Sequence, residues 1–341
     1  MKFNSMIYKI TKLNPSISSE NVGDDIILKY CQDELNSIFG ESLYVNVPTR
    51  EHLEDKSRDH IMSSDYAFVC GTNLLASNMN VVKQWNINIH DAFKIKRTGL
   101  RKREYLNFSK YSPGKLILMG AGWWQYQENP NRYTRLLLKL LLSSEQIHSV
   151  RDSYTEQMLK KIGINNVLNT ACPTMWNLSK EFCSEIPKEK ASKVVTTLTN
   201  YHTCEKDDKV MLDILRSQYK EVYVWLQSVE DYSYLKSMQG METIKIIPPN
   251  LAAYDKFLKQ NEVDYVGTRL HGGIRALNHK KRTLILAVDN RALEISKDTN
   301  LPVIERSKVE SELEGHVSRS YSTNITIPLE NIKKWKAQFH D

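Results

Sequence analysis

Paired cysteines, nucleotide-binding glycine loops and long apolar runs are all missing from this sequence. The five cysteines lie at positions 31, 70, 172, 183 and 204, with no CxxC spacing among them. An odd number without such spacing disfavours a disulfide framework or a zinc site and favours a reducing compartment. We therefore expect no metal site in this protein.

Segments typical of membrane insertion or export are also missing. No stretch approaches the ~20 apolar residues of a spanning helix, and the opening MKFNSMIYKITKLNPS lacks the apolar core of a signal peptide. We expect a cytoplasmic protein, and peripheral contact with the inner membrane surface stays open. Low-complexity tracts and short fixed repeats are absent as well, which argues against a solenoid.

The charge is moderately basic, at +7 with a pI of about 8.9. Surplus surface lysine explains this balance, and so does a face for an anionic ligand or membrane. We expect no nucleic-acid partner, because no helix-turn-helix, zinc-finger or RNP signature is present. The most basic run, Lys94–Tyr105, is either a solvated segment or a contact for phosphate groups.

Short apolar runs alternate with amphipathic helical runs along nearly the whole chain, which predicts an α/β fold with parallel sheets. The predicted strands are Met6–Ile10, Leu43–Val47, Tyr66–Cys70, Lys115–Met119, Ile147–Val150, Val194–Leu198, Val222–Leu226, Thr243–Ile246, Val263–Gly267 and Thr283–Ala287.

The 341 residues suffice for two domains. Residues 173–192 break the alternation with two prolines and a charged stretch, which marks the boundary. We predict an N-terminal domain at 1–178 and a C-terminal domain at 190–325. A helix at 326–341 is expected to pack back on the N-terminal domain.

Three strand-to-helix junctions are candidate sites, because ligands of parallel sheets bind beyond the carboxyl ends of the strands. The free N–H groups of a following helix suit an anion there. At the first junction, residues 21–25, Gly23 permits a tight turn. Asp24 either caps the helix or acts in the site as a proton acceptor or orienting group.

The second junction is residues 149–156, where the helix is expected to begin near Ser153. Arg151 either pairs with Asp152 in a structural contact or binds an anion through its planar fork.

The third junction is VDYVGTRLHGG, residues 263–273. Arg269 and His271 end a predicted strand directly before Gly272 and Gly273, and paired glycines let a ligand approach the backbone. An arginine and a histidine so placed favour an anion site over simple packing. Between the junctions, Trp123, Trp124 and Tyr126 either pack or stack on a sugar ring.

These elements resemble the polysaccharide pyruvyl transferase family in order and spacing. The matching segments are NVGDD, SVRDSYTEQMLKKIGINNV, ACPTMW and YVGTRLHGGIRAL. The resemblance implies two Rossmann-like domains facing a cleft, as in GT-B glycosyltransferases. It places functional positions at Asp24, Arg151, Arg269, Leu270 and His271.

The resemblance also implies an activity. Phosphoenolpyruvate would be the donor co-substrate, with no further cofactor, and a sugar of a cell-surface polysaccharide or its lipid-linked precursor would be the acceptor. Arg151 and Arg269 would hold the donor's two anionic groups, with Leu270, Gly272 and Gly23 beside them. We expect His271 to be the general acid and Asp24 the base.

Two other functions are weighed against this one. A GT-B glycosyltransferase with a nucleotide-sugar donor would share the fold and the anion site. A non-catalytic carbohydrate-binding scaffold would need neither Arg269 nor His271.

Overall fold

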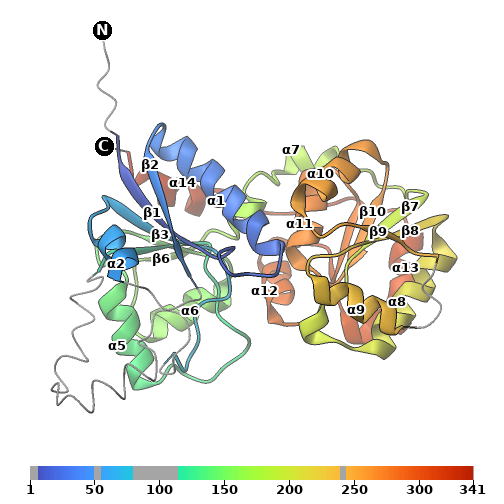
Figure 1. The fold of residues 1–341 in the computed structure, drawn as a ribbon, viewed down its shortest axis with the longest axis horizontal. Coiled ribbons are helices and arrows are strands. Elements are labelled where there is room, and N and C mark those ends of the chain that lie inside the picture. Colours follow the sequence, from blue (N-terminus) through green and yellow to red (C-terminus); the bar gives the residue numbers. More distant parts are fainter. Residues whose placement is uncertain (1–6, 50–54, 80–113, 239–242, 341) are drawn as a thin grey trace, which may run out of the picture. The chain divides into compact units, whose positions relative to one another are not determined.

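The computed structural model describes residues 7–49, 55–79, 114–238 and 243–340. The chain divides into two compact units (Figure 1). The first unit comprises residues 1–19, 27–173 and 328–341, and the second comprises residues 20–26 and 174–327. Each unit is an α/β structure on a parallel sheet, as predicted. The predicted cleft between two domains stays a prediction.

The first unit contains a four-stranded parallel sheet in the order β2-β1-β3-β4. Its strands are β1 (Lys9–Asn14), β2 (Leu43–Pro48), β3 (Tyr66–Cys70) and β4 (Leu116–Met119). A parallel pair, β5 (His148–Val150) and β6 (Val167–Asn169), continues beside β4 through a bridge between Ala121 and Val150. Because β3 and β4 are almost wholly buried, they read in the sequence as continuous apolar runs.

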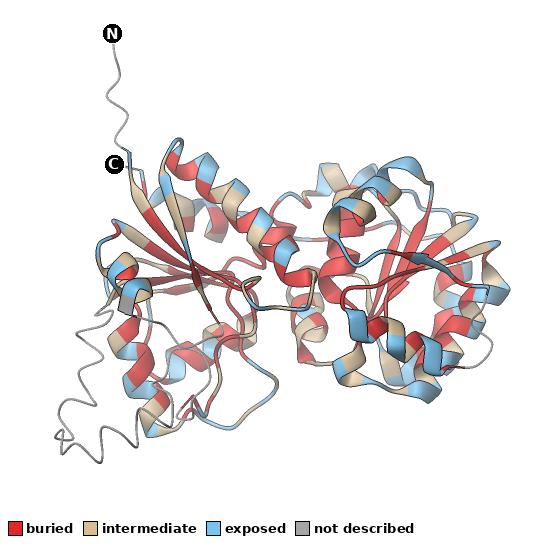
Figure 2. Ribbon diagram, viewed as in Figure 1, coloured by how far each residue is buried: buried red, intermediate tan, exposed pale blue. Residues whose placement is uncertain are grey.

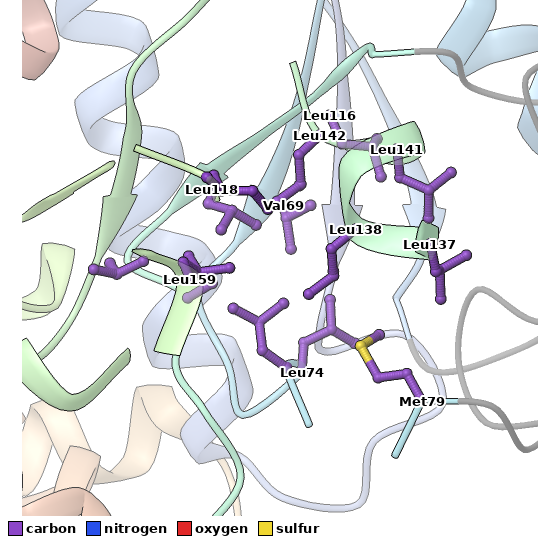
Figure 3. Packing of buried hydrophobic residues seen from close by; sticks show 14 of the residues in the cluster. Val69, Leu74, Met79, Leu116, Leu118, Leu137, Leu138, Leu141, Leu142 and Leu159 are labelled. Atoms are coloured by element: carbon purple, nitrogen blue, oxygen red, sulfur yellow. The ribbon is translucent and has the colours of Figure 1, made fainter. Parts of the chain in front are cut away.

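Helices pack against this sheet through a core of aliphatic side chains. The helices are α1 (Gly23–Phe39), which belongs to this unit from Ile27 onward, α2 (Asp55–Met62), α5 (Arg132–Leu141), α6 (Ser153–Lys161) and α14 (Leu329–Ala337). Figure 3 shows side chains of β3, β4, α5 and α6 converging in one cluster, with Leu74 and Met79 beside them. Helix α5 contributes Leu137, Leu138 and Leu141, whose spacing puts all three on one helix face.

The last helix of the chain, α14, belongs to the first unit and packs near β5 and β6. Trp335 is fully buried, with its ring centroid 6.0 Å from that of Phe68. Phe339, which follows the helix, lies 5.4 Å from the rings of Phe39, Tyr66 and Phe68. The C-terminal segment therefore supplies part of this unit's core.

The second unit contains a six-stranded parallel sheet in the order β12-β11-β10-β7-β8-β9. Its strands are β7 (Lys193–Thr196), β8 (Glu221–Trp225), β9 (Lys245–Ile247), β10 (Asp264–Gly267), β11 (Thr283–Ala287) and β12 (Val303–Glu305). Numbered from β7, this order is 3-2-1-4-5-6, that of Rossmann folds. The strand order reverses between β7 and β10, and that point is where such sheets bind ligands.

Helices flank this sheet on both sides, with their exposed faces outward (Figures 1 and 2). They are α7 (Lys180–Ser184), α8 (Glu205–Gln218), α9 (Val229–Ser237), α10 (Leu251–Gln260), α11 (Leu270–Asn278), α12 (Asn290–Thr299) and α13 (Val309–Ser318). Figure 1 shows α10, α11 and α12 on one side, and α8, α9 and α13 on the other. Three short 3-10 helices complete the described elements: Pro173–Met175, Asn200–His202 and Arg306–Lys308.

The structure corrects the predicted first strand. It was placed at Met6–Ile10, but β1 runs from Lys9 to Asn14. The polar residues of β1 have partners inside the unit. The Thr11 hydroxyl bonds with that of Ser64 at 2.5 Å, and the Lys12 ammonium donates to the side chain of Gln32. Buried polar groups with partners do not interrupt a strand.

The predicted domain limits differ from the units in two places. Residues 20–26, assigned to the N-terminal domain together with Asp24, belong to the second unit. A backbone bond holds them there, because the Val22 N–H donates to the Gln227 carbonyl at 3.0 Å. The second unit also starts directly at Thr174, so the stretch expected to separate the domains is part of it.

The basic run at residues 94–105 lies outside the described residues. Within the described parts of the chain, no helix is both long enough and apolar enough to cross a membrane.

Candidate active site

The Arg-Leu-His segment lies where strand β10 passes into helix α11. Only Thr268 and Arg269 separate the two elements. The loop after β7 fixes their backbone, because the Thr268 N–H donates to the Thr197 carbonyl at 3.2 Å and the Arg269 N–H donates to the Thr197 hydroxyl at 3.1 Å. Arg269 is therefore anchored where the strand order reverses.

The guanidinium of Arg269 is held from several directions. Its Nε donates to the Leu198 carbonyl at 2.8 Å, and its Nη2 donates to Asn200 Oδ1 at 3.0 Å and to Asp231 Oδ1 at 2.6 Å. The Tyr201 ring lies over the group, with its centroid 4.7 Å from Cζ. The remaining nitrogen, Nη1, is buried and has no hydrogen-bond partner among the described residues. This nitrogen is oriented and available to an anion.

Asp231, in the first turn of α9, organises the groups around Arg269. Its Oδ1 accepts from Arg269 and from the backbone N–H of Asn200 at 3.2 Å. Its Oδ2 accepts from the backbone N–H of Gln227 at 3.0 Å, and the side chain is 1% exposed. One buried carboxylate thus ties the segments after β7, β8 and β10 together.

A pocket opens at this point of the second unit. Its lining residues are Asn21, Gly23, Tyr201, Gln227, Thr268, Arg269, Leu270, His271, Leu286, Val288, Asp289, Arg291 and Ala292. Its empty volume is about 350 Å³, including the part open to solvent. All these residues belong to the second unit, and most follow the carboxyl ends of β7, β8, β10 and β11.

A second arginine lines the pocket. Arg291, in the first turn of α12, pairs with Asp289 at 2.6 Å and donates to the Tyr201 hydroxyl at 3.2 Å. Tyr201 thus contacts both arginines of the pocket, and it is 46% exposed. The pocket therefore offers two cationic groups and an exposed aromatic ring to a ligand.

The predicted residues Leu270 and His271 both line the pocket, in the first turn of α11. His271 is 8% exposed, so its imidazole is largely shielded from bulk water. A neighbouring histidine, His202, has its pKa lowered by burial, with Asp289 opposing the change and Arg291 adding to it. His202 is therefore neutral near pH 7.

The first junction contributes Asn21 and Gly23 to the pocket, but not Asp24. Asp24 is 3% exposed in the first turn of α1, where a carboxylate is favoured by the helix dipole. The Asn21 side chain accepts from the Gly23 N–H at 3.1 Å. This contact satisfies the first backbone N–H of α1.

Arg151 lies in the first unit, where the structure shows the pairing with Asp152. Its Nε donates to Asp152 Oδ2 at 3.0 Å, and its Nη2 contacts the Asn73 side chain and the Trp123 carbonyl. Asp152 also accepts from the Thr155 N–H at 2.7 Å. It is therefore the N-cap of α6, and Ser153 is the first helical residue.

The three predicted acceptor contacts differ in exposure. Trp123 is fully buried, and its indole N–H donates to Gln127 Oε1 at 3.1 Å. A buried ring offers no face to a sugar, so the prediction for Trp123 is wrong for this structure. Trp124 and Tyr126 are 38% and 55% exposed.

Sequence reasoning placed Asn21 in a candidate junction without a role and missed several other groups of the site, namely Tyr201, Gln227, Asp231, Asp289 and Arg291. The sequence feature that could have identified three of them is their position. Tyr201, Gln227 and Asp289 follow the ends of predicted strands by only a few residues. In the described part of the chain, no cluster of three or more His, Cys, Asp or Glu side chains could hold a metal ion.

Comparison with solved structures finds UDP-GlcNAc 2-epimerases among the matches. The UDP-GlcNAc 2-epimerase of Methanocaldococcus jannaschii, in complex with UDP-GlcNAc and UDP, is 13% identical with a TM-score of 0.49, over 96% of this chain and 97% of that chain. The UDP-GlcNAc 2-epimerase of Neisseria meningitidis, bound to UDP-GlcNAc, is 12% identical with a TM-score of 0.44, over 97% and 98%. No curated protein matches the chain significantly.

The family comparison is specific. The model of the polysaccharide pyruvyl transferase family matches residues 21–290, from the Asn21 turn through the Arg-Leu-His segment to the first turn of α12. This match spans every residue that lines the pocket except Arg291 and Ala292. The chain therefore belongs to the polysaccharide pyruvyl transferase family and is a transferase.

Proposed function

We propose that this enzyme transfers the enolpyruvyl unit of phosphoenolpyruvate to a sugar of a cell-surface polysaccharide or its lipid-linked precursor. Family membership supports a saccharide acceptor and a pyruvyl donor. The observation that carries the proposal is Arg269 Nη1, a buried cationic donor without a partner among the described residues, in a pocket shared with His271. That combination suits a small anion that must be protonated.

The reaction balances without an additional reagent. A proton adds to the methylene carbon of phosphoenolpyruvate, and a sugar hydroxyl oxygen bonds to the neighbouring carbon. The bond from that carbon to the phosphate oxygen breaks, and a second hydroxyl closes the ketal. The two hydroxyls release two protons, of which one replaces the proton used at carbon and the other leaves with phosphate.

His271 is the proton donor in this proposal. It lines the same pocket as Arg269, and an imidazole can donate a proton from a ring nitrogen. Arg269 binds an anionic group of the donor, and Leu270 and Gly23 shape the space around it. Arg151 stays a predicted contact for the second anionic group, although Asp152 already engages it.

The proton acceptor is one of two carboxylates. Asp24 is the sequence-based choice, and Asp289 lines the pocket itself. Asp24→Asn and Asp289→Asn separate the two, because the acceptor variant loses turnover by about 10²–10⁴-fold. On the acceptor side, Trp124 and Tyr126 present the exposed aromatic surface expected for sugar stacking. A lipid-linked acceptor would bring the enzyme to the cytoplasmic face of the inner membrane.

The test measures phosphate release from phosphoenolpyruvate with a panel of lipid-linked and simple hexosides. We expect His271→Ala to lower turnover by about 10²–10⁴-fold with the fold intact. His316→Ala is the matched control, since this histidine lies in the last turn of α13 and is absent from the pocket lining. Wild-type turnover by His271→Ala removes the histidine from the mechanism. Thermal stabilisation by UDP-sugars but not by phosphoenolpyruvate would favour a nucleotide-sugar transferase instead.

A further inference from the structure

Gln227 is a buried pocket residue to which the proposed reaction assigns no role. It follows β8 and is 1% exposed. Its backbone is fixed on both sides, because its N–H donates to Asp231 at 3.0 Å and its carbonyl accepts from Val22 at 3.0 Å. These two hydrogen bonds hold the backbone of Gln227 in place, and the residue lines the pocket.

Two glycines from separate junctions make room for the Gln227 side-chain amide. A Cβ atom at Gly23 would lie 3.2 Å from Gln227 Oε1, and one at Gly272 would lie 2.9 Å from Gln227 Nε2. Contacts this short would force the amide to move. Both glycines were expected to bind the donor, and they act here by leaving space for Gln227.

The amide nitrogen of Gln227 is buried and has no hydrogen-bond partner among the described residues. Arg269 Nη1 is in the same condition, and both residues line the same pocket. Buried donors without partners are unfavourable and rare in folded proteins. One anion with two or more oxygens would satisfy both of these donors.

We propose that the Gln227 amide and Arg269 Nη1 bind the same oxyanion, which makes Gln227 a donor-binding residue of this enzyme. The identity of the oxyanion, a carboxylate or phosphate group of phosphoenolpyruvate, rests on the proposed function. A neutral amide adds a directed donor without adding charge, so it selects for oxygen geometry while Arg269 supplies the attraction.

The test compares the full-length wild type with Gln227→Met, which keeps the side-chain length and removes the donor. Binding of phosphoenolpyruvate, pyruvate and inorganic phosphate is measured by calorimetry. We expect Gln227→Met to weaken phosphoenolpyruvate binding by about 10- to 100-fold, as for hydrogen bonds to charged groups. Pyruvate carries only the carboxylate and inorganic phosphate only the phosphate, so the probe whose binding weakens identifies the group. Gln218→Met is the control, because Gln218 is absent from the pocket lining and is half-buried, with its side chain bonded to Glu314 at 2.9 Å.

Wild-type affinity for all three probes in Gln227→Met overturns the inference. If that variant melts earlier than wild type without ligand, Gln227→Glu decides, because it keeps the shape and replaces the donor by a carboxylate. Loss of binding supports the contact, and unchanged binding overturns it.

A wild type that binds UDP but not phosphoenolpyruvate overturns the proposed function alone. In that case the Gln227→Met comparison is made with UDP, and weakened binding still supports the amide contact. A wild type that binds none of these anions overturns both.

Discussion

At the residue scale, Arg269 and Asp231 form a pair that serves both the stability and the charge of the pocket. Both side chains are at most 3% exposed, and Nη2 lies 2.6 Å from Oδ1. Removing one partner of a buried pair leaves an uncompensated charge, which costs about 3–5 kcal/mol. The same carboxylate offsets part of the positive charge that Arg269 presents to a ligand.

We therefore predict that Asp231→Asn lowers the free energy of unfolding by about 3 kcal/mol, while phosphoenolpyruvate stabilises the variant more than it stabilises wild type. The ligand then supplies the missing negative charge. Urea titrations with and without phosphoenolpyruvate measure both effects. Asp213→Asn, at an exposed pair with Arg216, should change the free energy by less than about 0.5 kcal/mol. Equal stabilisation of Asp231→Asn and wild type by the ligand would contradict the charge argument.

A second residue-scale prediction concerns His148, the first residue of β5, which is fully buried in the first unit. Its Nδ1 accepts from the Leu118 N–H at 3.3 Å, so Nε2 carries the proton donated to the Ser143 carbonyl at 2.9 Å. Burial lowers the pKa of His148 to about 4, although the Ser143 contact raises it in part. The folded protein thus holds this imidazole neutral down to about pH 4.

The unfolded chain binds a proton at His148 below its ordinary pKa, near 6.5, whereas the folded chain does so only near 4. Stability must therefore fall as the pH drops from about 6.5 to about 4, by roughly 3 kcal/mol for this group. In His148→Gln we expect lower stability at pH 7 and a shallower fall over that window. Urea titrations at several pH values measure the slope, and equal slopes in the two proteins would exclude His148 as its source.

At the element scale, Arg282 fastens helix α13 to the sheet of the second unit. Its Nη1 pairs with Asp264 Oδ2 at 2.6 Å. Its Nη2 donates to the carbonyls of His316, Val317 and Arg319 at 2.8–3.2 Å. Terminal carbonyls of a helix have no partner within the helix, so this arginine completes its C-terminal end.

We predict that Arg282→Met lowers the free energy of unfolding by about 3–5 kcal/mol, because Asp264 then stays buried without its cation. The double variant Arg282→Met, Asp264→Asn should recover part of that loss, since no buried charge remains. Urea unfolding followed by circular dichroism measures both. A double variant less stable than Arg282→Met would show that the ionic pair is not the source of the cost.

The elements themselves were largely predictable, because β3 and β11 are apolar runs with the observed bounds. The strands β6 and β12, of three residues each, escaped prediction because their runs are short. The pocket was only partly predictable. Arg269 and His271 stand out in their own segment, whereas Gln227 and Tyr201 join them only through the order of the strands. Sequence patterns reveal strands but not which strand ends lie side by side.

At the scale of the whole molecule, neither unit is one continuous segment of chain. Residues 20–26 complete the second unit, and residues 328–341 complete the first. Trp335, in residues 328–341, is fully buried in the first unit. The stability of the first unit should therefore depend on this segment. Large aromatic side chains cost about 3–5 kcal/mol when truncated to alanine in a core.

We predict that Trp335→Ala destabilises the first unit by about 3–5 kcal/mol, and that a chain ending at Ile327 loses the native packing of that unit. Leu329→Ala is the control on the same helix, because Leu329 is 48% exposed. Chemical denaturation of the full-length variants measures the loss. A truncated chain with wild-type near-ultraviolet circular dichroism would show that α14 is dispensable.

The late position of α14 also sets an order for folding during synthesis. The strands of the first unit leave the ribosome early, but Trp335 and Phe339, whose aromatic side chains contact Phe68, are translated only after residues 174–327. At about 5–20 residues per second, the stretch from Thr174 to Ile327 delays them by on the order of ten seconds. During this interval the apolar surface of the N-terminal sheet stays uncovered. Nascent-chain chaperones can bind to that surface. A stop codon just before α14 would therefore remove part of the core of the first unit.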